Sequence, residues 1–176
     1  MDAQPINNLI SEYRELYGFL NKNHQIALAI SISNHYKKIL LLSCASLYEK
    51  YFTEKLMEII KNKTNHESLS TLFYNKSIKQ QYFKFFDWKE DRGNIKSFLS
   101  LFGNEVQKQI QTEIDACSEL QEGMNAFLKI GYNRNLLVHE NFIVYNLEKT
   151  FDEIENLHNK AVKFLVFLMD AISKFV

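Results

Sequence analysis

Residues 39–47 read Ile-Leu-Leu-Leu-Ser-Cys-Ala-Ser-Leu, a run in which every side chain is apolar or small. The run lies in the middle of a longer stretch, residues 25–61, whose pattern predicts one continuous helix. A helix that is apolar nearly all the way round is buried by several neighbours. The small side chains of Ser43, Ala45 and Ser46 would also let another helix approach closely. The sequence therefore predicts a central helix that the rest of the fold surrounds.

Three more segments predict long helices around it. Residues 5–22 carry apolar side chains at helical spacing, beginning at Pro5, where a first helical turn tolerates proline. Residues 104–138 resume the spacing, with an expected break near residues 116–118. The last helix is the best defined, and its apolar side chains recur at spacings of three and four: Ile154, Leu157, Ala161, Phe164, Leu168, Ile172 and Phe175.

Shorter signals mark the connections between these helices. Thr150 and Glu153 have the spacing of a capping box, in which the two side chains bind free backbone amides reciprocally. Residues 140–149, which precede it, predict a loop. The region from residue 62 to 102 is less regular and predicts short helices inserted into a bundle. Within and just after that region we expect a turn at residues 62–65, helix caps at Ser68 and Ser77, and a helix end at Gly103.

The composition narrows the class of protein. Hydrophobic residues make up 46% and charged residues 24%, while the chain holds one proline and five glycines. These values favour a globular all-α fold, a single up-and-down helical bundle over residues 1–176 with short inserted helices. Cys44 and Cys117 show no paired spacing and are expected to be reduced. No signal-peptide pattern and no membrane-length apolar run is seen, so we expect a cytoplasmic protein without membrane contact.

The candidate active centre lies in residues 129–141, Lys-Ile-Gly-Tyr-Asn-Arg-Asn-Leu-Leu-Val-His-Glu-Asn. In a helix, Asn135 and His139 share a face, and the long side chain of Arg134 can reach the same point. Histidine can move the proton of a ribose 2′-hydroxyl or of a leaving oxygen, and arginine makes forked hydrogen bonds to phosphate. Asparagine can orient either partner. The three residues suit cleavage of an RNA phosphodiester without a metal or any other cofactor.

Residues 134–139, Arg-Asn-Leu-Leu-Val-His, resemble the Arg-Asn-x-x-x-His signature of the HEPN superfamily. Residues 40–52 and 92–103 are similar to the RiboL-PSP and related toxin-like branches of that superfamily. The resemblance covers roughly residues 25–176, although only the six-residue signature is specific. It implies a HEPN-like bundle that homodimerises, with two signatures facing each other across a cleft. Members often cut RNA without metal, leave a cyclic phosphate, and serve as toxins or antiviral effectors.

The resemblance also assigns roles to residues. It makes His139 the acid/base, Arg134 the phosphate-binding group and Asn135 the orienting group, with Glu49 as an accessory residue facing the cleft. Some HEPN toxins have a tyrosine two positions after the histidine, where a partner nucleotidyltransferase modifies them. This sequence has Asn141 there, which argues against that regulation, although Tyr145 lies nearby. An antitoxin or a sensor protein remains open as a partner.

Lysines alternate with aromatic side chains in residues 75–86. Lys76, Lys79 and Lys84 could guide RNA by charge while the aromatic rings stack on bases. The same pattern fits an amphipathic helix with lysines outward and aromatic rings inward. The histidines outside the signature show no metal-ligand spacing, so no metal site is expected. Trp88 is expected to pack inside the fold or at an interface.

Two other functions compete with a ribonuclease. Lysine and arginine number 21, as do aspartate and glutamate, so the formal net charge is zero. A protein that binds nucleic acid by bulk electrostatics is usually basic. The neutral charge favours a non-catalytic HEPN module that binds a nucleotide or a partner protein. The third alternative is a structural helical protein with an accidental signature, whose histidine would be buried or would cap a helix.

Overall fold

The central helix is present as predicted. A computed structural model describes residues 1–79, 81–140 and 142–176. Its longest element is α2 (Ile26–Thr64), a helix of 39 residues. Leu40, Leu41 and Phe52 on this helix have no exposed surface. This burial follows from the sequence, because apolar side chains on several sides of one helix need several neighbours to cover them, although Ile39 and Ser46 stay exposed.

The fold is all-α, as the sequence predicts. No β-strand occurs in the part of the chain that the structure describes. Nor does any helix there have the length and apolar character needed to cross a membrane. In chain order, the elements besides α2 are α1 (Gln4–Lys22), α3 (Glu67–Phe73), the π-helical turn η1 (Tyr74–Ile78), the 3₁₀ turn η2 (Tyr82–Lys84), α4 (Lys96–Ser100), α5 (Asn104–Asp115), α6 (Ser118–His139) and α7 (Phe151–Phe175).

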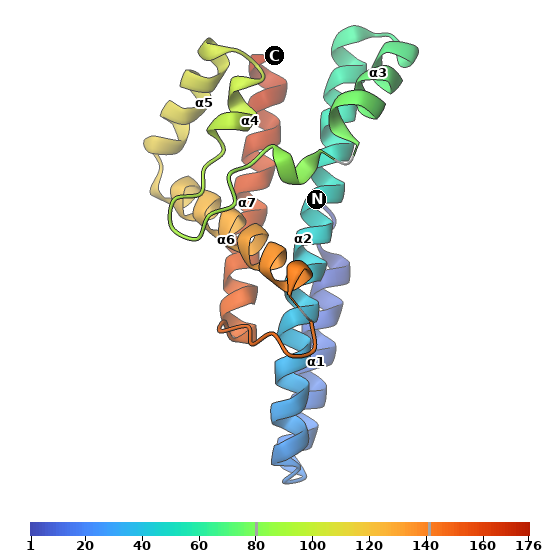
Figure 1. The fold of residues 1–176 in the computed structure, drawn as a ribbon, viewed down its shortest axis with the longest axis vertical. Coiled ribbons are helices and arrows are strands. Elements are labelled where there is room, and N and C mark those ends of the chain that lie inside the picture. The colour runs from blue at the N-terminus through green and yellow to red at the C-terminus, as the bar shows by residue number, and fades with distance from the viewer. Residues whose placement is uncertain (80, 141) are drawn as a thin grey trace.

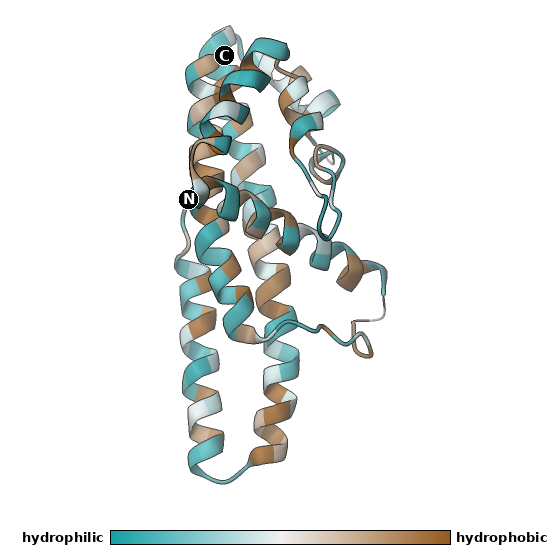
Figure 2. Cartoon of the chain, turned by 90° about the vertical axis from the view of Figure 1, so that its left-hand side faces the viewer, coloured by the Kyte–Doolittle hydropathy of each residue, from teal (hydrophilic) through white to brown (hydrophobic). Residues whose placement is uncertain are grey.

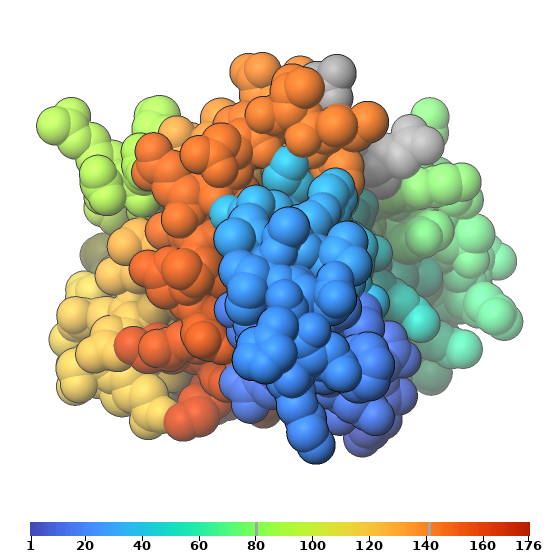
Figure 3. Space-filling model, turned by 90° about the horizontal axis from the view of Figure 1, so that it is seen from below, coloured from blue at the N-terminus to red at the C-terminus, as the bar shows by residue number. Residues whose placement is uncertain are grey.

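The long helices cover α2 from different sides (Figure 1). Helix α1 lies antiparallel along the first half of α2, and together they form a hairpin that extends beyond the rest of the molecule. Seen along its axis from below, this hairpin stands in front of the other helices (Figure 3). Its tip includes hydrophobic turns at the start of α2 (Figure 2), where Ile26, Leu28 and Ile30 are exposed. Helices α6 and α7 pack against each other and against α2.

Helix ends in the middle region differ from the prediction. Neither Ser68 nor Ser77 caps a helix: α3 begins at Glu67, and Ser77 lies within η1. The reason is that α2 continues to Thr64 and ends with Asn65 in a left-handed conformation (φ 50°), which shifts the next helix start. Helix α4 ends at Ser100, and Gly103, at φ 92°, forms the N-cap of α5 instead. The capping box at Thr150 is present, as predicted.

Trp88 packs against α6 at a glycine. A Cβ atom placed on Gly131 would clash with the six-membered ring of the Trp88 indole. The absence of a side chain at Gly131 therefore lets the indole reach the helix backbone. The indole also contacts Phe86 and Phe127, and its Nε1 donates a hydrogen bond to the carbonyl of Phe83 at 2.8 Å. Trp88 is thus a packing residue that fixes residues 83–88 on α6.

A buried polar pair joins α2 to α7. The hydroxyl of Tyr48 lies 2.9 Å from Nδ1 of His158, and both side chains are almost fully buried. Burial lowers the pKa of His158 to about 4 and raises that of Tyr48 well above its ordinary value. His158 is therefore neutral in the folded protein near pH 7 and hydrogen-bonded to a neutral phenol.

We expect opposite stability effects from two glycine substitutions. Gly131→Ala should destabilise the fold by about 1–3 kcal/mol, because the new methyl group displaces the Trp88 indole. Gly18→Ala is the matched control: Gly18 lies inside α1 with open space around it, so alanine should stabilise by about 0.5–1 kcal/mol. Urea unfolding of both variants measures the difference. Equal effects at the two positions would contradict the packing role of Gly131.

Stability should fall with acidity because of His158. The unfolded chain takes up a proton near pH 6.5, whereas the folded chain resists it until about pH 4. The contribution of His158 to the free energy of unfolding should therefore be fully present above pH 6.5. It should fall by about 3 kcal/mol as the pH drops to 4. Chemical denaturation at half-unit pH steps measures this decline. A His158→Gln variant should be less stable at neutral pH and should lose this part of the pH dependence.

Candidate functional site

The signature residues lie in the last two turns of α6. This helix ends at His139, and Glu140 leaves it in an extended conformation while its N–H bonds to the carbonyl of Leu136. Leu137 is buried and anchors the inner face of the helix. His139 is exposed, whereas Arg134 and Asn135 are half-buried. The end of α6 crosses α2 near the middle of its length (Figure 1).

Arg134 is held in place by two contacts. Its guanidinium lies over the ring of Phe83, with 3.7 Å from Cζ to the ring centroid. Its Nη1 donates a hydrogen bond of 3.2 Å to Oδ1 of Asn135. A cation over an aromatic face is stabilised by the ring's quadrupole. Phe83 was not predicted as part of the site. It is fixed in turn by Trp88, so the glycine at position 131 indirectly sets the position of Arg134.

Glu49, like Arg134, lies close enough to Tyr82 to influence its pKa. It is half-buried on α2, one residue after Tyr48. The two charged groups both act on Tyr82, a fully buried phenol: burial is the main cause of its raised pKa, Glu49 raises the pKa further, and Arg134 lowers it. The structure therefore brings a carboxylate from α2 and the guanidinium from α6 to one aromatic residue.

The side chain of His139 is exposed at the end of α6. Among the residues that the structure describes, none forms a hydrogen bond or an ion pair with its ring. It lies four positions after Asn135 and so on the same face of α6. A histidine that served only the core would be covered, and this one is exposed. Its ring can accept a proton from, or donate one to, a bound molecule.

The three predicted RNA-guiding lysines are all exposed. Lys76 belongs to η1, Lys79 follows it, and Lys84 ends η2 next to Phe83. Lysines point outward and the side chains of Ile78 and Tyr82 are buried, as the amphipathic alternative requires. The backbone is not one continuous helix, however, because η1 and η2 are separate turns. Only Lys84 adjoins a residue that contacts the signature.

Two lysines that the sequence analysis did not single out hold the loop after His139. Lys37 and Lys38 of α2 donate hydrogen bonds to backbone carbonyls of residues 142–147. A signal existed in the sequence, since two adjacent lysines precede the apolar run at residues 39–47. Lysines next to a buried apolar run need hydrogen-bond acceptors for their ammonium groups, but the sequence does not show that these are the carbonyls of residues 142–147.

Three further features were considered in the sequence: a metal site, Tyr145 and Asn141. No group of three or more metal-ligating side chains occurs in residues 1–79, 81–140 and 142–176. Tyr145 is half-buried in the loop, and burial, followed by the influence of Tyr132, raises its pKa. Asn141, the position at which some toxins carry a modified tyrosine, lies outside the described residues.

Comparisons with known proteins identify the family of this chain. Searches of curated proteins and of solved structures gave no match. A family model described as RiboL-PSP-HEPN matches residues 7–174, which is nearly the whole chain. The all-α fold is consistent with that match. The chain therefore belongs to the RiboL-PSP-HEPN family.

Proposed function

We propose that the chain is a metal-independent endoribonuclease of the HEPN type, with residues 1–176 acting as one domain and serving as a toxin or antiphage effector. HEPN domains are often ribonucleases. The observation that carries the proposal is the arrangement at the end of α6. Arg134 is held on Phe83 and Asn135, and one turn further along is an exposed histidine, His139, whose ring has no partner among the described residues.

The geometry suits transesterification of RNA. A ribose 2′-oxygen attacks the adjacent phosphorus while its proton passes to a base, and the bond from phosphorus to the 5′-oxygen breaks as that oxygen takes a proton from an acid. The products are a 2′,3′-cyclic phosphate and a 5′-hydroxyl. Arg134 would bind the phosphate oxygens, where charge accumulates, through the guanidinium N–H groups that Asn135 leaves free. Asn135 would orient the phosphate or the imidazole, and His139 would transfer a proton.

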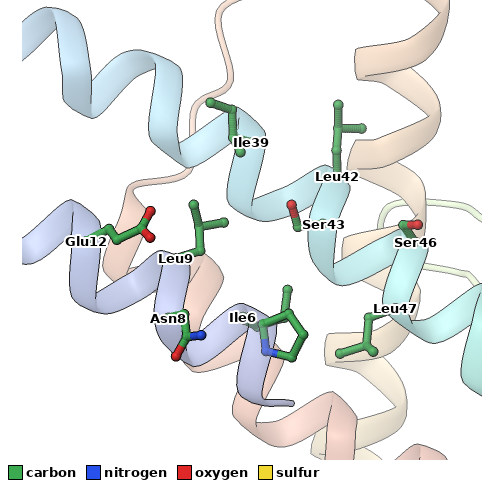
Figure 4. Close-up of a pocket in the computed structure, with 10 residues that line it drawn as sticks. Ile6, Asn8, Leu9, Glu12, Ile39, Leu42, Ser43, Ser46 and Leu47 are labelled. Atoms are coloured by element: carbon green, nitrogen blue, oxygen red, sulfur yellow. The ribbon is translucent and has the colours of Figure 1, made fainter. Parts of the chain in front are cut away.

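One protomer supplies a single histidine for two proton transfers, which supports a homodimer. A groove of about 690 Å³ between α1 and α2, lined by apolar side chains together with Asn8, Glu12, Ser43 and Ser46, offers a surface for the second copy (Figure 4). Ile39, Leu42 and Ser46 line its α2 side. Glu49 follows Ser46 by three positions and therefore lies on the same face of α2. A copy seated in this groove would therefore lie on the face of α2 that carries Glu49, the accessory residue.

The second candidate, a non-catalytic module that binds a nucleotide or a partner protein, is favoured by the zero net charge. Expression in a host cell separates the two. A ribonuclease toxin should arrest growth in its wild-type form and be tolerated as the His139→Ala variant. An antitoxin or sensor protein would then be sought as the partner that controls it.

RNA cleavage in the presence of a chelator tests the catalytic roles. Wild-type protein should cut total RNA, and His139→Ala should lower the rate by about 10²–10⁴-fold, because proton transfer is lost. Arg134→Lys should also lower it, since lysine cannot make forked hydrogen bonds or keep the same stacking on Phe83. His66→Ala, at an exposed histidine beside α3, is the control and should cut normally. Full activity of both signature variants would exclude this mechanism.

Sedimentation and light scattering test the dimer. We expect a wild-type dimer and a monomeric Ile39→Glu variant, because a second carboxylate in the groove, beside Glu12, adds like charge and cannot be desolvated cheaply. Ile39 is 39% exposed, so the substitution should leave the protomer folded. Leu72→Glu, at an exposed position on α3, is the matched control and should remain dimeric. A monomeric wild type at micromolar concentration would contradict the dimer.

A further inference from the structure

The loop that follows His139 is fastened to α2 at two places. Nζ of Lys38 donates to the carbonyl of Phe142 at 2.7 Å and to that of Ile143 at 3.3 Å. Nζ of Lys37 donates to the carbonyl of Leu147 at 2.7 Å. Two consecutive residues of the central helix thus hold the first and second halves of one loop.

Lys38 is unusual because its charge is buried. Only 5% of the residue is exposed, and its Nζ also lies 5.3 Å from the ring centroid of Phe142. Throughout the described ranges, no carboxylate forms an ion pair with it. Burying a charge is costly unless hydrogen bonds compensate, and here backbone carbonyls and an aromatic face supply the compensation. A methionine would fill the same space without that cost, so what the lysine adds is its bonds to the loop.

These bonds bear on the position of His139. The N–H of Glu140 is fixed to the carbonyl of Leu136, and the carbonyl of Phe142 is fixed to Lys38. Glu140, the neighbour of His139, is thus tied to α6, and Phe142, the next described residue, is tied to α2. The exposed ring of His139 has no bonding partner in the described part of the chain, so the backbone decides where it points.

We propose that Lys38 is a positioning residue of the candidate site. It holds the loop at residues 142–143, and through the backbone it sets the direction of the His139 side chain, without touching RNA. Its effect on cleavage rests on the proposed ribonuclease function, whereas its effect on the loop and on His139 does not.

The test compares three variants of the full chain. Lys38→Met removes the donor and keeps the bulk, Lys38→Arg restores a cation that can donate to both carbonyls, and Lys50→Met is the matched control. Lys50 is an exposed lysine of the same helix, with a 4.0 Å ion pair to Glu54. Hydrogen exchange at Glu140, whose N–H is bonded to Leu136, and at the buried Leu147 should be at least about ten-fold faster in Lys38→Met, because the loop opens more often once the charge-assisted hydrogen bonds are lost. Lys38→Arg and Lys50→Met should exchange as the wild type does.

The ring signals of His139, assigned by NMR with His139→Gln, supply the second measurement. They should move in Lys38→Met and return towards their wild-type positions in Lys38→Arg. Unchanged exchange would show that the loop is held without Lys38. Faster exchange with unmoved His139 signals would show an anchor that does not position the site. Either result overturns the proposal. If Lys38→Met does not fold, Lys38→Gln, which keeps a donor of shorter reach, takes its place.

Cleavage assays then separate the two proposals. In an active protein, Lys38→Met should lower kcat by about 10–100-fold and leave KM nearly unchanged, because the loss is one of alignment. An unchanged kcat in this variant would refute the positioning role. A wild type that cuts no RNA would refute the ribonuclease proposal, while exchange and NMR would still decide whether Lys38 orients His139.

Discussion

The burial of the apolar middle of α2, at Leu40, Leu41 and Phe52, is the constraint on which the other elements depend. Fully burying one large aliphatic or aromatic side chain contributes about 1.5–3 kcal/mol, and α2 carries many of them. No single neighbour can cover such a helix. Helix α1 covers its first half, and α6 and α7 cover other faces. Because α6 must cross α2 to do so, its end is carried to the middle of the molecule, where the signature lies.

Several polar residues of α2 interact with groups around the point where α6 crosses it. Lys37 and Lys38 hold the loop, Tyr48 bonds to His158 of α7, and Glu49 acts on the same buried phenol as Arg134. They are exceptions in a helix whose other inner positions are apolar. The scaffold helix and the candidate site are therefore not separate parts of this protein. A change in the core of α2 would be felt at the signature.

The sequence predicted the long helices and the shared helix face of the signature residues, because both depend on local periodicity. Residues four apart on one helix share a face whatever surrounds them, so Asn135 and His139 could be placed on one face of a helix. Contacts between distant segments could not be predicted in this way. Phe83 meets Arg134, and Trp88 meets Gly131, across more than forty residues of chain. Nothing in the local spacing of residues 75–86 encodes those partners, and the irregular turns there replace the expected helix.

The contact between Trp88 and Gly131 has a consequence for how this sequence can change over evolutionary time. A larger residue at position 131 requires a smaller one at position 88, and a smaller residue at position 88 leaves a hollow against α6. Substitutions at the two positions are therefore expected to occur together. Because the same indole also holds Phe83, a drift at this pair would be transmitted to the arginine of the signature. Relatives that lack the tryptophan should therefore position that arginine through other contacts.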